Sequence, residues 1–157
     1  MTIEVGPSFS FGGSGRLVSF CVYAPEPGHR IATPLDAKAL VWSIKPEGSS
    51  PSGAFVTEMG LVYGKVPRGY EQTVPVARTA DPLIVGQIYY FVAETTGATG
   101  AHGFFHMDKN EPIPIDVPGL CPSAFVGDVK PVKCGTNEPY VEPKDLGEFV
   151  REHRVKE

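Results

Sequence analysis

Residues 88–94, with the sequence Ile-Tyr-Tyr-Phe-Val-Ala-Glu, are the stretch that decides the fold of this chain. β-Branched and aromatic side chains fit the pleated, half-buried surface of a sheet, so this run predicts a β-strand. Tyr89 and Phe91 are in phase with aliphatic neighbours, as is Trp42 in an earlier run. We therefore expect these three aromatic side chains to lie in a hydrophobic core.

Similar apolar patterns predict further strands along the chain. Within residues 16–23, the side chains of Val18, Phe20 and Val22 are expected to share one apolar face. The other expected strands are residues 3–11, 40–45, 60–66, 70–74 and 102–107. The chain also has 18 glycines and 16 prolines, together nearly twice the usual share of about 12%. They are spread along the whole length, which is typical of an all-β domain of short strands and tight turns.

The turn between the strands expected at 60–66 and 70–74 is Pro67-Arg68-Gly69, which has the composition of a β-hairpin loop. Tyr63 and Tyr70 flank it. Exposed tyrosines near a turn, with Arg68 between them, suit a protein-binding surface. The alternative, which we favour, is that the two tyrosines pack across the hairpin.

One segment carries a resemblance to a known family. Leu83, Gly86 and Tyr89, followed by Phe91 and Ala93, have the spacing Leu-x-x-Gly-x-x-Tyr-x-Phe-x-Ala. This pattern resembles the tyrosine corner and following strand of fibronectin type III and immunoglobulin-like domains. The earlier run Leu-Val-Trp-Ser at 40–43 is similar to the early strand of that family with its buried tryptophan. The resemblance spans about residues 38–107 and implies an antiparallel β-sandwich that acts as a binding or structural module, without catalytic residues to transfer.

The last third of the chain has a different composition. We expect a β-sandwich domain over residues 1–108 and a Pro-rich extension over 109–157 that packs on the same domain. Prolines at alternate positions in 111–118 exclude a central strand and predict an extended strap. Residues 143–155 predict a short helix, because Leu146, Phe149, Val150 and His153 share one face at helical spacing. Phe149 is a further candidate for contact with a partner, since this stripe can dock either on its own domain or on another protein.

Three cysteines, Cys21, Cys121 and Cys134, are an odd number and imply no disulfide framework. Cys121 and Cys134 are close in sequence and are candidates for a disulfide in an oxidising compartment. The alternative is two reduced thiols in a cytoplasmic protein.

The sequence offers little catalytic or metal-binding chemistry. His102 and His106 would share a helix face, but the run 102–106 predicts a strand, where positions four apart lie about 13 Å from one another. That distance is too long for two ligands of one metal. Cys21 has Ser19 and Tyr23 on its own face and no nearby histidine in sequence. We therefore predict no catalytic residue, no metal ligand and no cofactor.

Charge and hydropathy limit the classes of partner. The net charge is −4 and there is no basic stripe, so a nucleic acid partner is not expected. No run is long and apolar enough to span a membrane. The start, Met-Thr-Ile-Glu, is no signal peptide, which leaves a cytoplasmic protein or a mature or trimmed envelope protein.

The function that these observations favour is a non-enzymatic protein-binding or structural module, as an envelope accessory domain or an assembly component. Its partner would be another protein or a second copy of the chain. One alternative is a small inhibitory or immunity-type protein that acts through an acidic face. Another is an enzyme with a site assembled from loops, drawing on His29, His102, His106 or Cys21.

Overall fold

The computed structural model describes residues 7–9, 15–48, 60–96, 100–109, 111–125 and 128–155. Its strands are β1 (Ser8–Phe9), β2 (Leu17–Tyr23), β3 (Leu40–Pro46), β4 (Leu61–Val62), β5 (Tyr70–Val74), β6 (Ile88–Thr95), β7 (Ala101–Asp108), β8 (Glu111–Ile115), β9 (Leu120–Phe125) and β10 (Asp128–Lys133). A 3-10 turn, η1 (Ala37–Ala39), precedes β3, and the helix α1 (Leu146–His153) lies near the C-terminus. Much of the strand expected at 3–11 falls outside the described residues.

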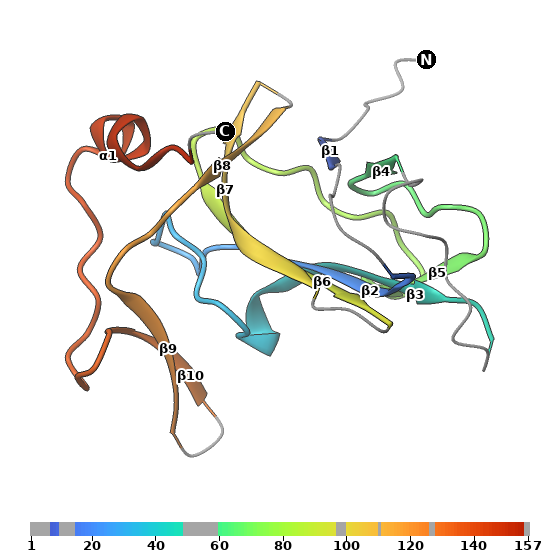
Figure 1. Ribbon diagram of the computed structural model, residues 1–157, viewed down its shortest axis with the longest axis horizontal. Coiled ribbons are helices and arrows are strands. Elements are labelled where there is room, and N and C mark those ends of the chain that lie inside the picture. The colour runs from blue at the N-terminus through green and yellow to red at the C-terminus, as the bar shows by residue number, and fades with distance from the viewer. Residues whose placement is uncertain are drawn as a thin grey trace.

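Six strands form one antiparallel sheet in the order β5-β3-β2-β6-β7-β8. Two smaller antiparallel sheets accompany it, β1 with β4 and β9 with β10. Figure 1 shows β1 and β4 above the main sheet and the β9–β10 hairpin below it, at the end where α1 lies. The prediction of an all-β, sandwich-like fold with a short C-terminal helix is confirmed. No described helix is long and apolar enough to cross a membrane.

The first hydrophobic cluster lies between the main sheet and the β1–β4 pair. Phe20 and Trp42 are fully buried, and the ring of Phe9 lies 5.2 Å from the ring of Phe20. Tyr89 is buried as well, while Phe91 is partly buried against the same cluster. The expected placement of Trp42, Tyr89 and Phe91 in the core is therefore confirmed.

The apolar face of β2 differs from the expected one at its first position. Leu17 is fully buried, together with Phe20 and Val22, whereas Val18 is only partly buried. The pairing of β2 with β6 is irregular between Leu17 and Ser19, where a bulge adds one residue. A bulge shifts the alternation of side chains by one position, so the pattern read across 16–23 misplaced Val18.

The prediction of a β-hairpin around residues 67–69 is wrong. β4 pairs with β1, and β5 pairs with β3, so residues 63–69 connect the small sheet to an edge of the large one. Tyr63 and Tyr70 are buried, with 5% and 4% of their surfaces exposed. Their hydroxyls donate to the carbonyls of Asp81 at 2.8 Å and Leu17 at 2.7 Å. A buried tyrosine needs such a partner, and this burial removes both residues from any exposed binding surface.

The segment before β6 has the local geometry that the Leu-x-x-Gly-x-x-Tyr spacing predicts. The backbone N–H of Ile84 donates to the hydroxyl of Tyr89 at 2.7 Å. Gly86 has a φ of 96°, a left-handed value that favours glycine. Leu83 packs against the first cluster. These contacts fix the direction in which the chain enters β6, one of the two middle strands of the sheet.

Residues 111–115 form β8, an edge strand of the main sheet, and not a strap lying over it. Pro112 and Pro114 lack an N–H group, which an edge strand tolerates on its unpaired side. The carbonyl of Pro114 accepts from the N–H of Val155 at 3.1 Å, and the N–H of Asp116 donates to His153 at 2.8 Å. The end of α1 therefore covers part of this edge.

The sequence did not predict strands after residue 107, but β9 and β10 form a further hairpin. Cys121 and Cys134 are joined by a disulfide at the base of this hairpin. Closing a loop of this size stabilises a fold by about 3 kcal/mol in the chain-entropy account. Pro122 and Pro131 face each other in the register, and they contribute to the Pro-rich composition from which we expected an extension without strands here.

A second hydrophobic cluster joins the extension to the main sheet. α1 begins after Asp145, whose carboxylate accepts from the N–H of Glu148 at 3.0 Å. Leu146, Phe149 and Val150 pack towards a group that includes residues of β6 and β8, as the helical stripe predicted. The members of the cluster are Ile31, Ile88, Ile115, Val117, Leu120 and Val150, with Phe104, Ile113, Tyr140, Leu146 and Phe149 packed against them.

Replacing Tyr89 with phenylalanine tests the role of its hydroxyl. The Y89F variant keeps the ring but leaves the N–H of Ile84 without its acceptor. We expect the free energy of unfolding to fall by about 0.5–1.5 kcal/mol in urea denaturation followed by circular dichroism. Tyr140→Phe is a matched control, because no hydrogen bond of the Tyr140 hydroxyl to the described residues is present. An equal fall in the free energy of unfolding in Y89F and Y140F would contradict the prediction.

Candidate functional site

A cleft of about 290 Å³ lies between the loop that follows β2 and the β9–β10 hairpin. In Figure 1 this loop, coloured blue to cyan, lies between the main sheet and the hairpin. The residues that line the cleft are Glu26, His29, Asp36 and Lys38 from the loop, and Val129, Lys130 and Pro131 from β10. We call it the loop–hairpin cleft. Charged side chains of both signs therefore meet in one concave surface.

The loop wall is attached to the start of β6 by backbone hydrogen bonds. The N–H of Ile88 donates to the carbonyl of Arg30, and the N–H of Ala32 donates to the carbonyl of Ile88, both at 2.9 Å. Ile31 and Ala32 are buried. These residues belong to no named strand, but Ile31 lies against Ile88 of the sheet as a single parallel bridge.

Glu142 connects the same loop to the C-terminal extension. Its carboxylate accepts from the backbone N–H of Arg30 at 2.8 Å and from that of Ile31 at 3.0 Å. It also pairs with the side chains of Arg30, at 3.6 Å, and His29, at 3.5 Å. The guanidinium of Arg30 donates to the carbonyl of Pro143. Hydrogen bonds to an ionised acceptor are about twice as strong as neutral ones. The contacts of Glu142 with residues 29–31, which we call the Glu142 contacts, therefore hold the loop against the extension.

Asp36 is the most enclosed charged residue of the cleft, with 4% of its surface exposed. Its Oδ1 accepts from the backbone N–H of Lys38 at 3.1 Å and so caps η1. Its Oδ2 is buried and has no hydrogen-bond partner among the described residues. Most buried polar atoms in proteins are paired, which makes this oxygen the unusual feature of the cleft.

The hairpin wall is held by contacts of its own. The N–H of Tyr140 donates to the carbonyl of Pro131 at 3.1 Å, and the N–H of Lys133 donates to that of Glu138 at 2.9 Å. The disulfide between Cys121 and Cys134 closes the base of the hairpin. Both walls of the cleft are therefore fixed before any ligand arrives.

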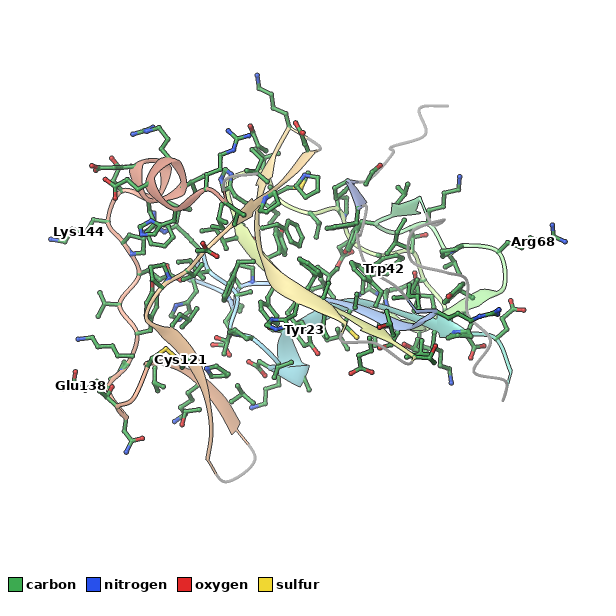
Figure 2. All side chains as sticks on the ribbon, viewed as in Figure 1. Tyr23, Trp42, Arg68, Cys121, Glu138 and Lys144 are labelled. Carbon is green, nitrogen blue, oxygen red and sulfur yellow. A yellow bond between two sulfur atoms is a disulfide. The ribbon has the colours of Figure 1, made fainter. Side chains whose placement is uncertain are left out.

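The binding residues proposed from the sequence do not form one surface. Arg68 is exposed and extends at the far end of the molecule from Cys121, as Figure 2 shows. Tyr63 and Tyr70 are buried. Phe149 packs on the second cluster and stacks on His153 with ring centres 4.2 Å apart. Phe149 thus contacts its own domain, the first of the two interpretations of the helix stripe.

The two histidines considered as metal ligands lie on a strand, β7, as predicted. His102 Nδ1 lies 2.9 Å from the hydroxyl of Tyr90, and these two side chains form a hydrogen-bonded pair. His106 Nδ1 is buried without a partner among the described residues. In the part of the chain that the structure describes, no group of three potential metal ligands is found.

Cys21 is partly buried, and its Sγ lies 3.4 Å from the hydroxyl of Ser43 on the neighbouring strand. Burial is the largest influence on this thiol and raises its pKa, which the hydrogen bond with Ser43 opposes. A raised pKa keeps the thiol protonated at neutral pH, and the thiolate is the nucleophilic form. This environment does not suit a catalytic cysteine.

Sequence reasoning missed Glu26, Asp36, Lys130 and Glu142 as residues of one site. Glu142 lies 112 positions from the backbone N–H that it binds. The only signal in the sequence was that His29 and several charged residues occur in loops rich in proline and glycine. Charged residues in loops are usually solvated, so this pattern alone does not identify a binding site.

Comparison of the chain with family models, with curated proteins and with solved structures finds no match. The candidate site therefore rests on geometry and chemistry alone.

Replacing Glu142 with glutamine should loosen the loop wall. We expect E142Q to lose about 1.5–3 kcal/mol of unfolding free energy, because a charged acceptor of two backbone N–H groups is removed. In hydrogen exchange, the amides of Arg30 and Ile31 should exchange faster in E142Q than in wild type.

Glu138→Gln is the matched control in the same extension. Its pair with Lys133 joins side chains that are 69% and 52% exposed, and such pairs contribute about 0–1 kcal/mol. Similar exchange rates at both amides in E142Q and wild type would show that the Glu142 contacts do not hold the loop.

Stability should depend on pH through His106. Burial lowers the pKa of His106 below its ordinary value of 6.5, while Asp108 and the carbonyl of Gly86 oppose that shift. A group that is harder to protonate in the folded state makes the unfolded chain bind more protons at acidic pH. The contribution is therefore fully present above about pH 6.5 and is lost as the pH falls below it. Urea denaturation between pH 7.5 and 5.5 should show a smaller decline for H106Q than for wild type. Parallel declines would show that His106 is not responsible.

Proposed function

We propose that this chain is a non-enzymatic binding or structural module, of the fibronectin type III or immunoglobulin-like kind, that recognises another protein through the loop–hairpin cleft. The observation that carries the proposal is the cleft itself, which charged side chains of both signs line from two separate segments of the chain. Concave sites with a few fixed polar groups are where proteins bind their ligands. The partner would be a peptide segment of a protein, because the cleft is small.

Rigidity supports this assignment. The loop wall is held by Glu142 and by β6, and the hairpin wall by a disulfide and by the segment 138–140. A site whose walls are already in place does not lose conformational entropy when it binds, so more of the contact energy appears as affinity.

The position of the hairpin supports it as well. Within the described ranges, β9 and β10 pair with each other and with no strand of the main sheet. Figure 1 shows the hairpin extending away from the body. An element that stands beside the core and carries one wall of a cleft is well placed to contact a second protein.

The test is selection from a random peptide library displayed on phage, with the immobilised full chain as bait. We expect enriched peptides with a shared pattern, and we expect Lys130→Glu to weaken their binding at least tenfold in surface plasmon resonance. Lys130 is an exposed residue of the cleft. Arg68→Glu is the matched control, since it reverses an exposed charge at the other end of the molecule.

Two results would contradict the proposal. One is the absence of any peptide enriched above a surface without protein. The other is loss of binding in R68E with full binding in K130E, which would place recognition at the turn 67–69 instead.

A further inference from the structure

We infer that the disulfide between Cys121 and Cys134 is a reversible redox switch that controls the loop–hairpin cleft. Its reduction by a dithiol releases the β9–β10 hairpin, which carries one wall of the cleft, while the main sheet stays folded. The inference rests on the proposed function, because it concerns the regulation of the same site. Its structural part is tested without any ligand.

The first step of the argument is the position of the disulfide. It joins the first strand of the hairpin to the residue that follows the second strand, 13 positions later in the sequence. Cys134 is exposed and Cys121 is partly buried. Figure 2 shows the bond where the hairpin leaves the rest of the molecule. A disulfide exchanges only with a thiolate that can reach one of its sulfurs, and exposed disulfides are the labile and regulatory ones. This bond is therefore placed for exchange with an external thiol.

The second step is how little packing holds the hairpin. Within the described ranges, β9 and β10 form a sheet of their own, apart from the main sheet. No described side chain of β10 belongs to either hydrophobic cluster, and Leu120 is the only described side chain of β9 that does. An isolated two-stranded hairpin is at best marginally stable in water. The disulfide therefore supplies stability that the packing of the hairpin lacks.

The third step concerns the contacts between the two strands. Pro122 and Pro131 lie opposite each other in the register. Because proline has no N–H group, this pair adds no hydrogen bond to the ladder. The N–H of Cys134 donates to the carbonyl of Gly119 at 2.9 Å, directly beside the disulfide. The segment 138–140 supports the outer edge of β10 only. The disulfide is thus the covalent link that keeps the base of β10 on β9.

The fourth step connects the hairpin to the cleft. Val129, Lys130 and Pro131 of β10 form the wall that faces the loop. The loop itself is held by the Glu142 contacts and by β6, and these interactions involve neither cysteine. Reduction therefore acts on one wall only. A ligand must then order the hairpin as it binds, and this cost in conformational entropy lowers its affinity.

The exchange transfers two electrons from the dithiol to the protein. One thiol of the dithiol loses its proton and attacks the sulfur of Cys134, the more exposed cysteine, and the bond between the two protein sulfurs breaks. Cys121 leaves as a thiolate and takes up a proton. The second thiol of the dithiol loses its proton and attacks the mixed disulfide, which releases the thiolate of Cys134. That thiolate is protonated in turn, and the dithiol ends as a disulfide.

The experiment compares hydrogen exchange in the ¹⁵N-labelled full chain before and after treatment with dithiothreitol in buffer without denaturant. Alkylation and mass spectrometry should show two new thiols. Two hairpin amides report on its release: Val132, which lies opposite Cys121, and Cys134, which is bonded to Gly119. They should exchange at least about tenfold faster after reduction.

Two amides of the main sheet serve as the internal reference. The N–H groups of Ile88 in β6 and Met107 in β7 donate to the carbonyls of Arg30 and Gln87. Their exchange rates should not change on reduction. Treatment of the reduced chain with oxidised dithiothreitol should restore the slow exchange of the hairpin amides.

The double variant C121S/C134S lacks the disulfide under all conditions, and we expect it to exchange as reduced wild type does. Cys21→Ser is the matched control, because Cys21 is the free cysteine of the chain. C21S should keep the disulfide and respond to dithiothreitol as wild type does. Peptides selected by phage display should bind the reduced chain and the double variant at least about tenfold more weakly than the oxidised chain.

Four outcomes would overturn the inference. They are a disulfide that dithiothreitol reduces only in denaturant, unchanged exchange of the hairpin amides, faster exchange of the main-sheet amides, and unchanged peptide affinity in the reduced chain. Failure of C121S/C134S to fold would count with the third, because the bond would then support the whole fold. The first three outcomes need no ligand. They are therefore distinct from failure of the proposed function, in which phage display enriches no peptide.

Discussion

The carboxylate of Glu142 is the polar contact that joins the C-terminal extension to the loop after β2. It binds the backbone of Arg30 and Ile31, and the carbonyl of Arg30 in turn accepts from the first residue of β6. Glu142 thus links the extension, through the loop, to β6, one of the two middle strands of the main sheet, beside the apolar contacts of the second cluster. Because N–H groups near a buried residue such as Ile31 must find acceptors, this ion satisfies the backbone as well as placing the extension.

A second constraint determines where the sheet ends. Pro112 and Pro114 cannot donate to a further strand, so β8 must be an edge. The chain then leaves the sheet and returns through β9, β10 and α1, and the N–H of Val155 reaches the carbonyl of Pro114. The prolines that prevent another strand therefore also create the need for a covering segment. Its apolar side chains complete the second hydrophobic cluster.

The sequence could predict what is local. Alternation of side chains and turn residues identified the strands around 16–23, 40–45, 70–74, 88–94 and 102–107 and the C-terminal helix, because each depends on neighbouring residues. Which strand pairs with which was harder to predict from the sequence. A turn at 67–69 suggested a hairpin, yet β4 prefers β1, a strand more than fifty positions earlier. The bulge at Leu17 and the prolines within β9 and β10 break the local patterns in the same way, because contacts from distant parts of the chain compensate for them.

The candidate site was beyond prediction for a related physical reason. Its residues are ordinary charged side chains in loops, and only the fold makes Asp36 unusual by burying it. Asparagine or serine at this cap could also accept from the N–H of Lys38, so the local sequence does not mark the position. The buried oxygen of Asp36 without a hydrogen-bond partner, more than the shape of the cleft, distinguishes this surface from the other loops that the structure describes.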